Sequence, residues 1–204
     1  MQSAQTVFIV DDDQDFRESL TWLLEGAGHT VISFENAEVF LQQYQQQAGC
    51  LLLDVRMAGM SGLALQQELN QRGYAIPVIM ITGHGDVAMA VQAMKNHAVD
   101  FIEKPFDDEA LLSLVAETLN RSPTIFAEAN KSQQVKDCWE QLSKREKDVA
   151  KQVIQGLANR EIAESLDISI KTVEIHRCRV MKKMQAKRLA DLMGLVPYLE
   201  EALQ

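Results

Sequence analysis

The chain has 204 residues, a formal net charge of −9 and 47% hydrophobic residues, and no apolar run is long enough to cross a bilayer. This length permits one large domain or two modest ones. The three cysteines are widely separated and fit neither a disulfide framework nor a paired-cysteine zinc site, and the first residues lack a signal-type segment. We therefore expect a cytoplasmic protein that does not contact a membrane.

Charge is divided unevenly along the chain. Residues 1–120 hold 17 Asp/Glu and 5 Lys/Arg, whereas residues 121–204 hold 12 and 15, so the formal charges are −12 and +3. Between 169 and 190, seven basic residues oppose only Glu174. This asymmetry predicts a different partner for each half, with nucleic acid a candidate for the second. On charge alone, a solvated helix face explains the basic run equally well.

Strands and helices alternate through the first 120 residues. Apolar strands are predicted at 6–10, 30–34, 50–53, 77–81 and 99–103. Amphipathic helices are predicted at 14–27, 36–47, 62–72, 86–97 and 107–120. Such alternation predicts a doubly wound, five-stranded parallel sheet with helices on both faces. Ligands of these sheets bind outside the carboxyl ends of the strands.

Charged and hydroxyl side chains stand at the ends of four of these strands. The first strand ends in Asp11, Asp12 and Asp13, and the others end in Asp54, Thr82 and Lys104. Crowded carboxylates repel one another unless a divalent cation screens them, and a carboxylate beside Mg²⁺ can accept a phosphoryl group. The pattern therefore predicts phosphorylation on an aspartate, and a bound Mg²⁺ ion.

Each side chain has a predicted role in this site. Asp54 is the candidate acceptor because it directly follows the apolar strand at 50–53. Thr82 and Lys104 are candidates for contacts with the phosphoryl oxygens. Asp13 is more simply explained as the N-cap of the next helix. Mg²⁺ keeps several waters and needs few protein oxygens; the candidate donors are Asp11, Asp12, Asp54 and the backbone carbonyl of Arg56.

Two other readings of this half are open. The stretch 83–88 spells G-x-G-x-x-A between a strand and a helix, as in a dinucleotide-binding turn. However, it follows the fourth strand rather than the first, it leaves the aspartates unexplained, and Asp86 suits the cap of the next helix. A phosphatase or phosphomutase would also use an aspartyl phosphate, but it usually needs a substrate-enclosing cap and a second acid, and no cap insertion is evident.

Residues 1–120 resemble a response-regulator receiver domain. The stretches that carry the resemblance are VFIVDDD, CLLLDVRM, PVIMITGHGD and DFIEKPF, in the family's order and spacing. The resemblance implies a flavodoxin-like fold and a sensor histidine kinase as the phosphate donor. In that family, the fourth helix, fifth strand and fifth helix change shape on phosphorylation and often dimerise. The matching positions are Asp54 for the phosphorylated aspartate, Asp11 and Asp12 for the Mg²⁺ acids, and Thr82, Phe101 and Lys104 for the switch.

Two positions depart from the family pattern. Ala58 stands where proline is usual, which predicts a less rigid loop after Asp54. His97 stands where glycine is usual, and histidine tolerates a positive φ less well than glycine. Both departures concern loop rigidity and switching rather than the acceptor itself.

No strand is evident beyond residue 121. Residues 121–138, which include Pro123, predict a linker that can be helical in part. Helices are predicted at 143–155, 159–166, 170–184 and 187–202, with Gly156 ending the first and Asn159 and Ser169 capping the second and third. A short helix, a tight turn and a longer basic helix predict a helix-turn-helix. In the longer helix, Val173, Val180 and Met184 form the predicted buried stripe.

Residues 142–198 resemble the four-helix LuxR-type output domain, through LSKRE and GLANREIAESLDISIKTVEIHRCRVMKKM. The resemblance implies that the third helix enters the major groove of duplex DNA. It assigns groove-facing positions to Glu174, Ile175 and Cys178, and phosphate or groove-edge contacts to Lys171, Thr172, Arg177, Arg179 and Lys182. Glu146 is expected to pair with a core arginine. The last helix, with Leu192, Leu195, Val196 and Leu199, resembles a dimerising helix.

Together the halves resemble a FixJ/NarL-type response regulator, and HRCRVMKKMQA is similar to regulators of tetrathionate respiration. We expect an α/β receiver at 1–120, a linker at 121–138 and an all-α DNA-binding domain at 139–204. The resemblance implies phosphorylation by a sensor histidine kinase, homodimerisation, promoter binding and contact with RNA polymerase. Two alternatives are a regulator that binds DNA independently of phosphorylation, and a phosphoaspartate enzyme with an accessory helical domain.

Overall fold

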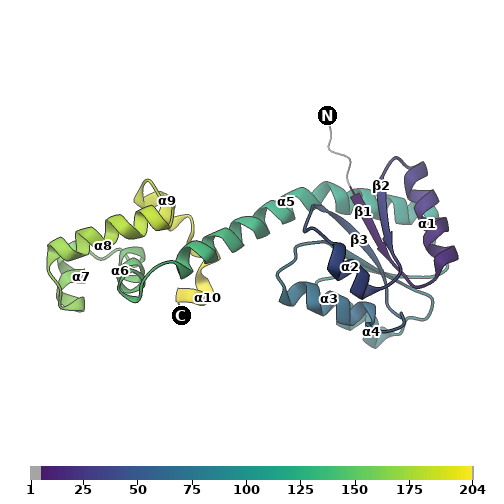
Figure 1. The fold of residues 1–204 in the computed structure, drawn as a ribbon, viewed down its shortest axis with the longest axis horizontal. Coiled ribbons are helices and arrows are strands. Elements are labelled where there is room, and N and C mark those ends of the chain that lie inside the picture. The colour runs from purple at the N-terminus through teal and green to yellow at the C-terminus, as the bar shows by residue number, and fades with distance from the viewer. Residues whose placement is uncertain (1–5, 204) are drawn as a thin grey trace. The chain divides into compact units, whose positions relative to one another are not determined.

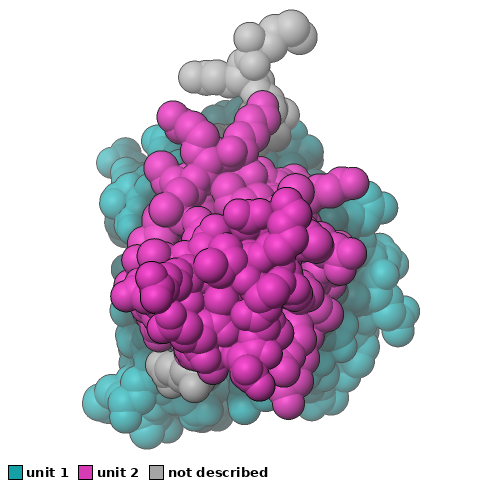
Figure 2. Space-filling view, turned by 90° about the vertical axis from the view of Figure 1, so that its left-hand side faces the viewer, with its two compact units in different colours: residues 1–129 teal, residues 130–204 magenta. Residues whose placement is uncertain are grey.

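The structure is a computed structural model that describes residues 6–203, apart from the side chain of Glu201. The first five residues, on which the expectation of no signal segment partly rests, lie outside the described residues. The chain forms two compact units, one ending at Ala129 and the other beginning at Asn130 (Figure 2). Within residues 6–203, no helix has the combination of length and apolar character needed to cross a membrane.

A five-stranded parallel sheet forms the centre of the first unit. Its strands are β1 (Thr6–Val10), β2 (Thr30–Phe34), β3 (Gly49–Asp54), β4 (Val78–Thr82) and β5 (Asp100–Glu103), arranged in the order β2-β1-β3-β4-β5. Every neighbouring pair is parallel. The fold class predicted from the strand–helix alternation is confirmed, and the predicted strand bounds agree to within one residue.

Helices cover both faces of this sheet (Figure 1). On one face, α1 (Gln14–Gly26) packs with the first part of α5 (Asp108–Glu140); on the other lie α2 (Ala37–Gln43), α3 (Gly62–Gln71) and α4 (Val87–Lys95). Because both faces are covered, all residues of β3 and β4 are buried, as expected for a central parallel strand. The predicted caps Asp13 and Asp86 are confirmed, since each accepts a backbone N–H of its helix.

The helix predicted at 107–120 continues through the whole segment predicted as a linker and ends at Glu140, with Pro123 inside it. Its first part packs on the sheet through buried apolar residues, and Ser122 accepts from Gly49 N at 2.8 Å and donates to Gly49 O at 2.7 Å. Its last part contributes Cys138 and Trp139 to the core of the second unit. Between 123 and 134 no residue is buried, so the sequence there has no apolar periodicity to reveal a helix.

The second unit is helical. It contains the end of α5, then α6 (Lys144–Ile154), α7 (Asn159–Leu166), α8 (Ile170–Lys183), α9 (Leu189–Met193), a 3-10 turn η1 (Val196–Tyr198) and α10 (Glu200–Leu203). The single helix predicted at 187–202 is wrong, because this segment is divided into three short pieces. Gly194 separates α9 from η1, and Pro197 lacks the N–H that a continuous helix needs.

Local signals explain where the helices of the second unit begin and end. Ser143 caps α6, Ser169 caps α8 as predicted, and Gly156 follows α6 with a φ of 88°. The prediction that Asn159 caps α7 is wrong: Asn159 is the first residue of the helix, and its side chain has another partner in α8. Asp167 ends α7 with a φ of 52° and starts the turn into α8.

Candidate functional site

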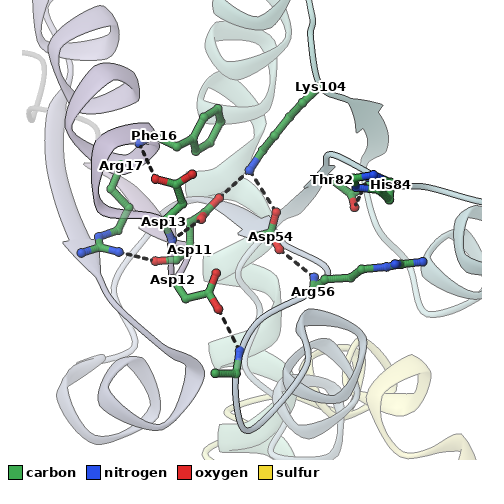
Figure 3. A network of polar contacts seen from close by, with 11 residues as sticks. Asp11, Asp12, Asp13, Phe16, Arg17, Asp54, Arg56, Thr82, His84 and Lys104 are labelled. Atoms are coloured by element: carbon green, nitrogen blue, oxygen red, sulfur yellow. Dashed lines mark hydrogen bonds and ion pairs between the residues drawn. The ribbon is translucent and has the colours of Figure 1, made fainter.

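The strand-end side chains meet at one edge of the sheet, as the parallel topology requires (Figure 3). Asp11, Asp54 and Thr82 are almost fully buried there, with 2%, 7% and 1% of their surfaces exposed. Asp12 and Asp13 are exposed. The fold therefore brings two buried carboxylates and a buried hydroxyl to the position where such sheets bind ligands.

Lys104 links the two buried carboxylates. Its Nζ lies 2.7 Å from Asp11 Oδ2 and 3.0 Å from Asp54 Oδ1, and its side chain is 21% exposed. The Lys104–Pro105 peptide bond that follows is cis. A single ammonium group thus offsets part of the repulsion between carboxylates that β1 and β3 bring together.

Asp54 remains in an unfavourable electrostatic position despite this ion pair. Burial raises the pKa of its carboxyl, and the nearby charge of Asp11 raises it further, while hydrogen bonds from Lys104 and from the backbone of Arg56 act in the opposite direction. The Arg56 N–H donates to Asp54 Oδ2 at 2.6 Å. The raised pKa shows that the ionised carboxylate is disfavoured in this position, so an added cation would stabilise it, and a carboxylate beside such a cation can form an acyl phosphate.

The carboxylates of Asp11 and Asp12 also accept hydrogen bonds from the backbone of the surrounding loops. Asp11 Oδ1 accepts from Asp13 N at 2.9 Å, and Asp12 Oδ2 accepts from Ala58 N at 2.9 Å. Because proline has no N–H, the Asp12–Ala58 bond depends on the departure from the family pattern at position 58. The loop after Asp54 is thus tied to the strand end of β1.

The aspartates at this edge of the sheet can bind a hard cation such as Mg²⁺ only if water molecules and a backbone oxygen supply its remaining ligands. Among residues 6–203, there is no cluster of three or more His, Cys, Asp or Glu side chains that could hold a metal ion without other ligands. However, Mg²⁺ prefers oxygen ligands and usually binds through one or two carboxylates plus waters. Asp11, Asp12 and Asp54, with the Arg56 carbonyl, supply oxygens of this kind.

The candidate switch residues are close together. Thr82 Oγ1 accepts from His84 N at 3.3 Å, and Phe101 is only partly buried. A Cβ placed on Gly85 would lie 2.8 Å from Phe101 Cε1 and 3.1 Å from Thr82 Cγ2, so Gly85 permits both side chains to occupy this corner. Close packing therefore explains this glycine of the G-x-G stretch without a dinucleotide.

Sequence reasoning missed several neighbours of the site. Phe16 places its ring against Lys104, and Arg17 Nη1 donates to the backbone oxygen of Asp11 at 2.7 Å. Gly85 and the Ala58 N–H were also not assigned a role. The spacing of Phe16 and Arg17 after the aspartates was visible, but nothing in one sequence shows that the start of α1 turns back toward the end of β5.

The predicted recognition helix, α8, has a buried face and an exposed face. Val173, Val180 and Met184 are buried, as predicted. The side chains assigned to base readout, Glu174, Ile175 and Cys178, are exposed. The basic side chains Lys171, Arg179 and Lys182 are exposed as well, so six of the eight candidate DNA contacts lie on the outer face of the helix.

Four of the eight candidates have side-chain partners within their own unit. Lys171 Nζ lies 3.3 Å from Glu174 Oε2, so these two exposed candidates pair with each other. Arg177 Nη1 donates to Asn159 Oδ1 at 3.0 Å, which ties α8 to the start of α7. Thr172 Oγ1 lies 2.8 Å from Ser169 Oγ, beside the cap of α8. Both side chains are partly buried. The Arg177 contact joins α8 to α7, whereas the Thr172 contact lies within the first turn of α8 and its cap.

Glu146 is a structural residue, but its predicted partner is wrong. The expected core arginine is replaced by Lys183, whose Nζ lies 2.6 Å from Glu146 Oε2. Ser143 N also donates to this carboxylate, and the Lys183 and Ser143 bonds lower the pKa of Glu146 to about 2. The pair joins the start of α6 to the end of α8, and Lys183 also donates to Gln141 O.

The fold and the two sites define a receiver domain joined to a helix-turn-helix domain. Residues 7–116 match the response regulator receiver domain family, and residues 140–196 match the bacterial regulatory proteins of the luxR family. The chain belongs to the response regulators that carry a luxR-type domain, and it is a transcriptional regulator. The predicted class, FixJ/NarL-type response regulator, is thereby confirmed.

Relatives match over nearly the whole chain. Response regulator protein TodT of Pseudomonas putida is 42% identical over 202 residues, covering 98% of this chain and 89% of TodT. Transcriptional regulatory protein FixJ of Azorhizobium caulinodans is 44% identical over 196 residues, covering 96% and 93%.

Two solved structures share the architecture. The response regulator StyR has a TM-score of 0.68 at 40% identity, covering 96% of this chain and 99% of StyR. Full-length FixJ from B. japonicum has a TM-score of 0.57 at 36% identity, covering 98% and 99%. Because the relatives are named as regulators, the phosphoaspartate enzyme is set aside. The similarity to regulators of tetrathionate respiration stays a prediction.

Proposed function

We propose that Asp54 accepts a phosphoryl group from a sensor histidine kinase and that this modification controls the binding of α8 to promoter DNA. The observation that carries the proposal is the Lys104 ammonium held between Asp11 and Asp54 at 2.7 and 3.0 Å. A buried carboxylate with a raised pKa lies beside a fixed cation at the edge of the sheet. The two carboxylates exceed the single ammonium group in charge, and this excess suits a divalent cation, beside which the Asp54 carboxylate can accept a phosphoryl group.

The chain's own residues supply the chemistry at Asp54. An Asp54 oxygen attacks phosphorus, the bond between phosphorus and the donor atom breaks, and the donor keeps that electron pair. Lys104 moves from its carboxylate partners to an oxygen of the phosphoryl group, where it stabilises the charge. When bound by Asp11, Asp12, Asp54 and the Arg56 carbonyl, Mg²⁺ would neutralise the remaining charge on the phosphoryl oxygens.

The switch follows from a new hydrogen bond of Thr82. Its hydroxyl accepts from His84 N through a lone pair, and after phosphorylation its O–H would donate to a phosphoryl oxygen. Gly85 lies beside both Thr82 and Phe101, so the aromatic ring would adjust when Thr82 moves. The neighbouring helix α4 exposes Val87, Val91 and Met94, which supports homodimerisation through this face on activation.

DNA binding is assigned to the outer face of α8. Glu174 can accept from cytosine N4, Ile175 can contact a thymine methyl, and Arg179 and Lys182 can neutralise phosphates. Arg177 and Thr172 would act mainly by holding α8 in place. The dimer would bind two half-sites in the cytoplasm and contact RNA polymerase. This assignment is supported by the exposure of the face and by its excess of basic side chains.

The acceptor assignment is tested by phosphorylating the purified full-length protein with a small phosphodonor and Mg²⁺, and measuring intact mass. We expect one added phosphoryl group, lost in Asp54→Asn and strongly reduced by chelation of Mg²⁺. Asp13→Asn is the matched control, because this nearby carboxylate only caps α1 and asparagine caps equally well. Retention of the modification in Asp54→Asn would overturn the assignment.

A further inference from the structure

The ring of Phe16 lies directly against the ammonium group of Lys104 (Figure 3). Nζ is 3.5 Å from the ring centroid, well within the distance at which the negative face of an aromatic ring attracts a cation. Phe16 is the third residue of α1, and its N–H donates to the capping carboxylate of Asp13 at 3.1 Å. The helix start that carries the ring is therefore fixed by a hydrogen bond of its own.

The same ring also contacts the loop that carries Lys104. Phe16 and Phe106 meet edge to face, with centroids 6.2 Å apart and an interplanar angle of 82°. Phe106 follows Lys104 by two residues, across the cis bond to Pro105. Phe16 thus contacts both the charged end of the lysine and the backbone segment from which the lysine extends.

The contacts of Lys104 differ in whether they survive phosphorylation. Its two carboxylate partners, Asp11 and Asp54, change their charge or their ligands when a phosphoryl group arrives. An ammonium group has three N–H donors, and at least one must be transferred to a phosphoryl oxygen. The ring carries no lone pair that competes for these donors, so its attraction persists while the carboxylate partners are exchanged.

We infer that Phe16 is a positioning residue for phosphoryl transfer, and that its ring face holds the Lys104 ammonium group above the Asp54 carboxylate. This inference rests on the proposed function, because Lys104 needs to be aimed only if Asp54 accepts a phosphoryl group. Phe16 does not touch Asp54 or the transferred group; it acts through Lys104. A partly buried ring at this position would otherwise serve only to cover apolar surface on α1 and the loop after β5.

The test distinguishes the effect of the electron density on the ring face of Phe16 from the effect of the volume of its side chain. Site-specific replacement of Phe16 by mono-, di- and trifluorophenylalanine withdraws electron density from the ring face with little change of shape. We expect the rate of Asp54 phosphorylation by a small phosphodonor to fall stepwise along this series. Phe16→Leu, which keeps an apolar side chain without the ring, is expected to lower the rate between about two-fold and thirty-fold, and Phe16→Trp to preserve it.

A double-mutant cycle supplies the second readout. In a Lys104→Gln background, where phosphorylation is expected to be slower and is followed over a long incubation, Phe16→Leu is expected to have no further effect on the rate. Equal rates across the fluorinated series, or an unchanged effect of Phe16→Leu without Lys104, would overturn the inference. The wild-type reaction separates the two proposals: absence of Asp54 phosphorylation there contradicts the proposed function, whereas normal phosphorylation with an insensitive ring contradicts only the role of Phe16.

Discussion

Lys104 Nζ lies 3.0 Å from Asp54 Oδ1, yet this ion pair does not restore an ordinary pKa to the aspartate. Burial, together with the charge of Asp11, raises the pKa of the Asp54 carboxyl more than Lys104 and the Arg56 N–H lower it. The lysine is shared, since it is closer to Asp11 Oδ2 at 2.7 Å. Two buried carboxylates and one ammonium group leave an excess of negative charge, and that excess is the basis of both the function and the first prediction.

Replacing the acceptor should stabilise the receiver unit. A carboxyl whose pKa is raised on folding favours the folded state most at low pH, and that contribution is lost as pH rises through the raised value. At pH 7 the charged Asp54 therefore costs stability, and Asp54→Asn should raise the free energy of unfolding by an amount on the order of 1 kcal/mol. Thermal unfolding from pH 7 to pH 4 measures this, and the gain should shrink at the acid end.

The control for this experiment is again Asp13→Asn, which changes the charge equally at an exposed cap. It should leave the stability within a few tenths of a kcal/mol of the wild type. If Asp54→Asn instead destabilised the protein at pH 7, the Lys104 pair would have to outweigh the burial of Asp54, and the electrostatic account of the site would be wrong.

The ion pair in the second unit should behave in the opposite way. Glu146 is 3% exposed, and hydrogen bonds from Lys183 and Ser143 lower its pKa from 4.5 to about 2. A lowered pKa stabilises the folded state above the unfolded value, and this stability is lost as pH falls from about 4.5 toward 2. Glu146→Gln should therefore destabilise the second unit by roughly 2 kcal/mol at pH 7, because Lys183 is only partly exposed and loses its partner.

The exposed pair Arg160–Glu164, at 3.0 Å, is the matched control. Glu164→Gln should change stability by less than about 0.5 kcal/mol, because both side chains are well solvated. Chemical unfolding at pH 7 and pH 3 compares the two variants. A pH-independent effect of Glu146→Gln would contradict the assigned role of its charge.

His97 should carry a backbone cost at the turn between α4 and β5. Its φ is 68°, a left-handed conformation that costs a residue with a side chain about 1–2 kcal/mol. The turn is held in this form by Gln66 and Asn70, whose side chains both donate to Asn96 O. His97→Gly should stabilise the receiver unit by about 0.5–1 kcal/mol, since the extra freedom of glycine in the unfolded chain offsets part of the gain.

Asn96→Gly is the matched control for this turn. Asn96 has an ordinary φ of −87°, so glycine there relieves nothing and should destabilise the protein by about 0.5–1 kcal/mol. The two neighbouring substitutions are thus predicted to have opposite signs in the same unfolding experiment. The same sign for both would show that the backbone conformation of position 97 does not limit stability.

The two kinds of residue on α8 should affect DNA binding differently. Lys182→Gln should weaken binding to all sequences and reduce the slope of log K against log salt by about 1. Glu174→Ala should instead relax discrimination at one base pair by about 1–3 kcal/mol with little change of slope. Lys144→Gln, an equal loss of charge on the exposed start of α6, should change neither. A sequence-specific effect of Lys182→Gln would contradict its assignment to phosphate.

Most of the receiver architecture could be predicted because its signals are local. Apolar strands that end in charged residues can be predicted from short stretches of sequence, and the parallel topology then requires their ends to meet. The position of Lys104 between Asp11 and Asp54 follows from this logic. The contact of Phe16 with Lys104 does not, because it depends on how the first turn of α1 is oriented relative to the loop after β5.

The errors share a physical cause, which is the lack of a local signal. In α5, none of the residues 123–134 is buried, so this part of the sequence has no apolar periodicity. Pro123 predicts the end of a helix, but α5 continues through it to Glu140. The last helix was predicted from apolar spacing alone, although Gly194 and Pro197 interrupt it. Leu192 and Leu199, expected at a dimer interface, are instead buried in the core of their own unit.

Duplex binding by the full-length protein tests the central claim most directly. A fixed library of promoter fragments is presented to the wild type and to Asp54→Asn, each with and without Mg²⁺ and a small phosphodonor. We predict sequence-selective binding by the wild type that the phosphodonor strengthens, and no such strengthening in Asp54→Asn. Equal, selective binding under every condition would contradict control by phosphorylation of Asp54, and would leave a regulator whose DNA binding is independent of it.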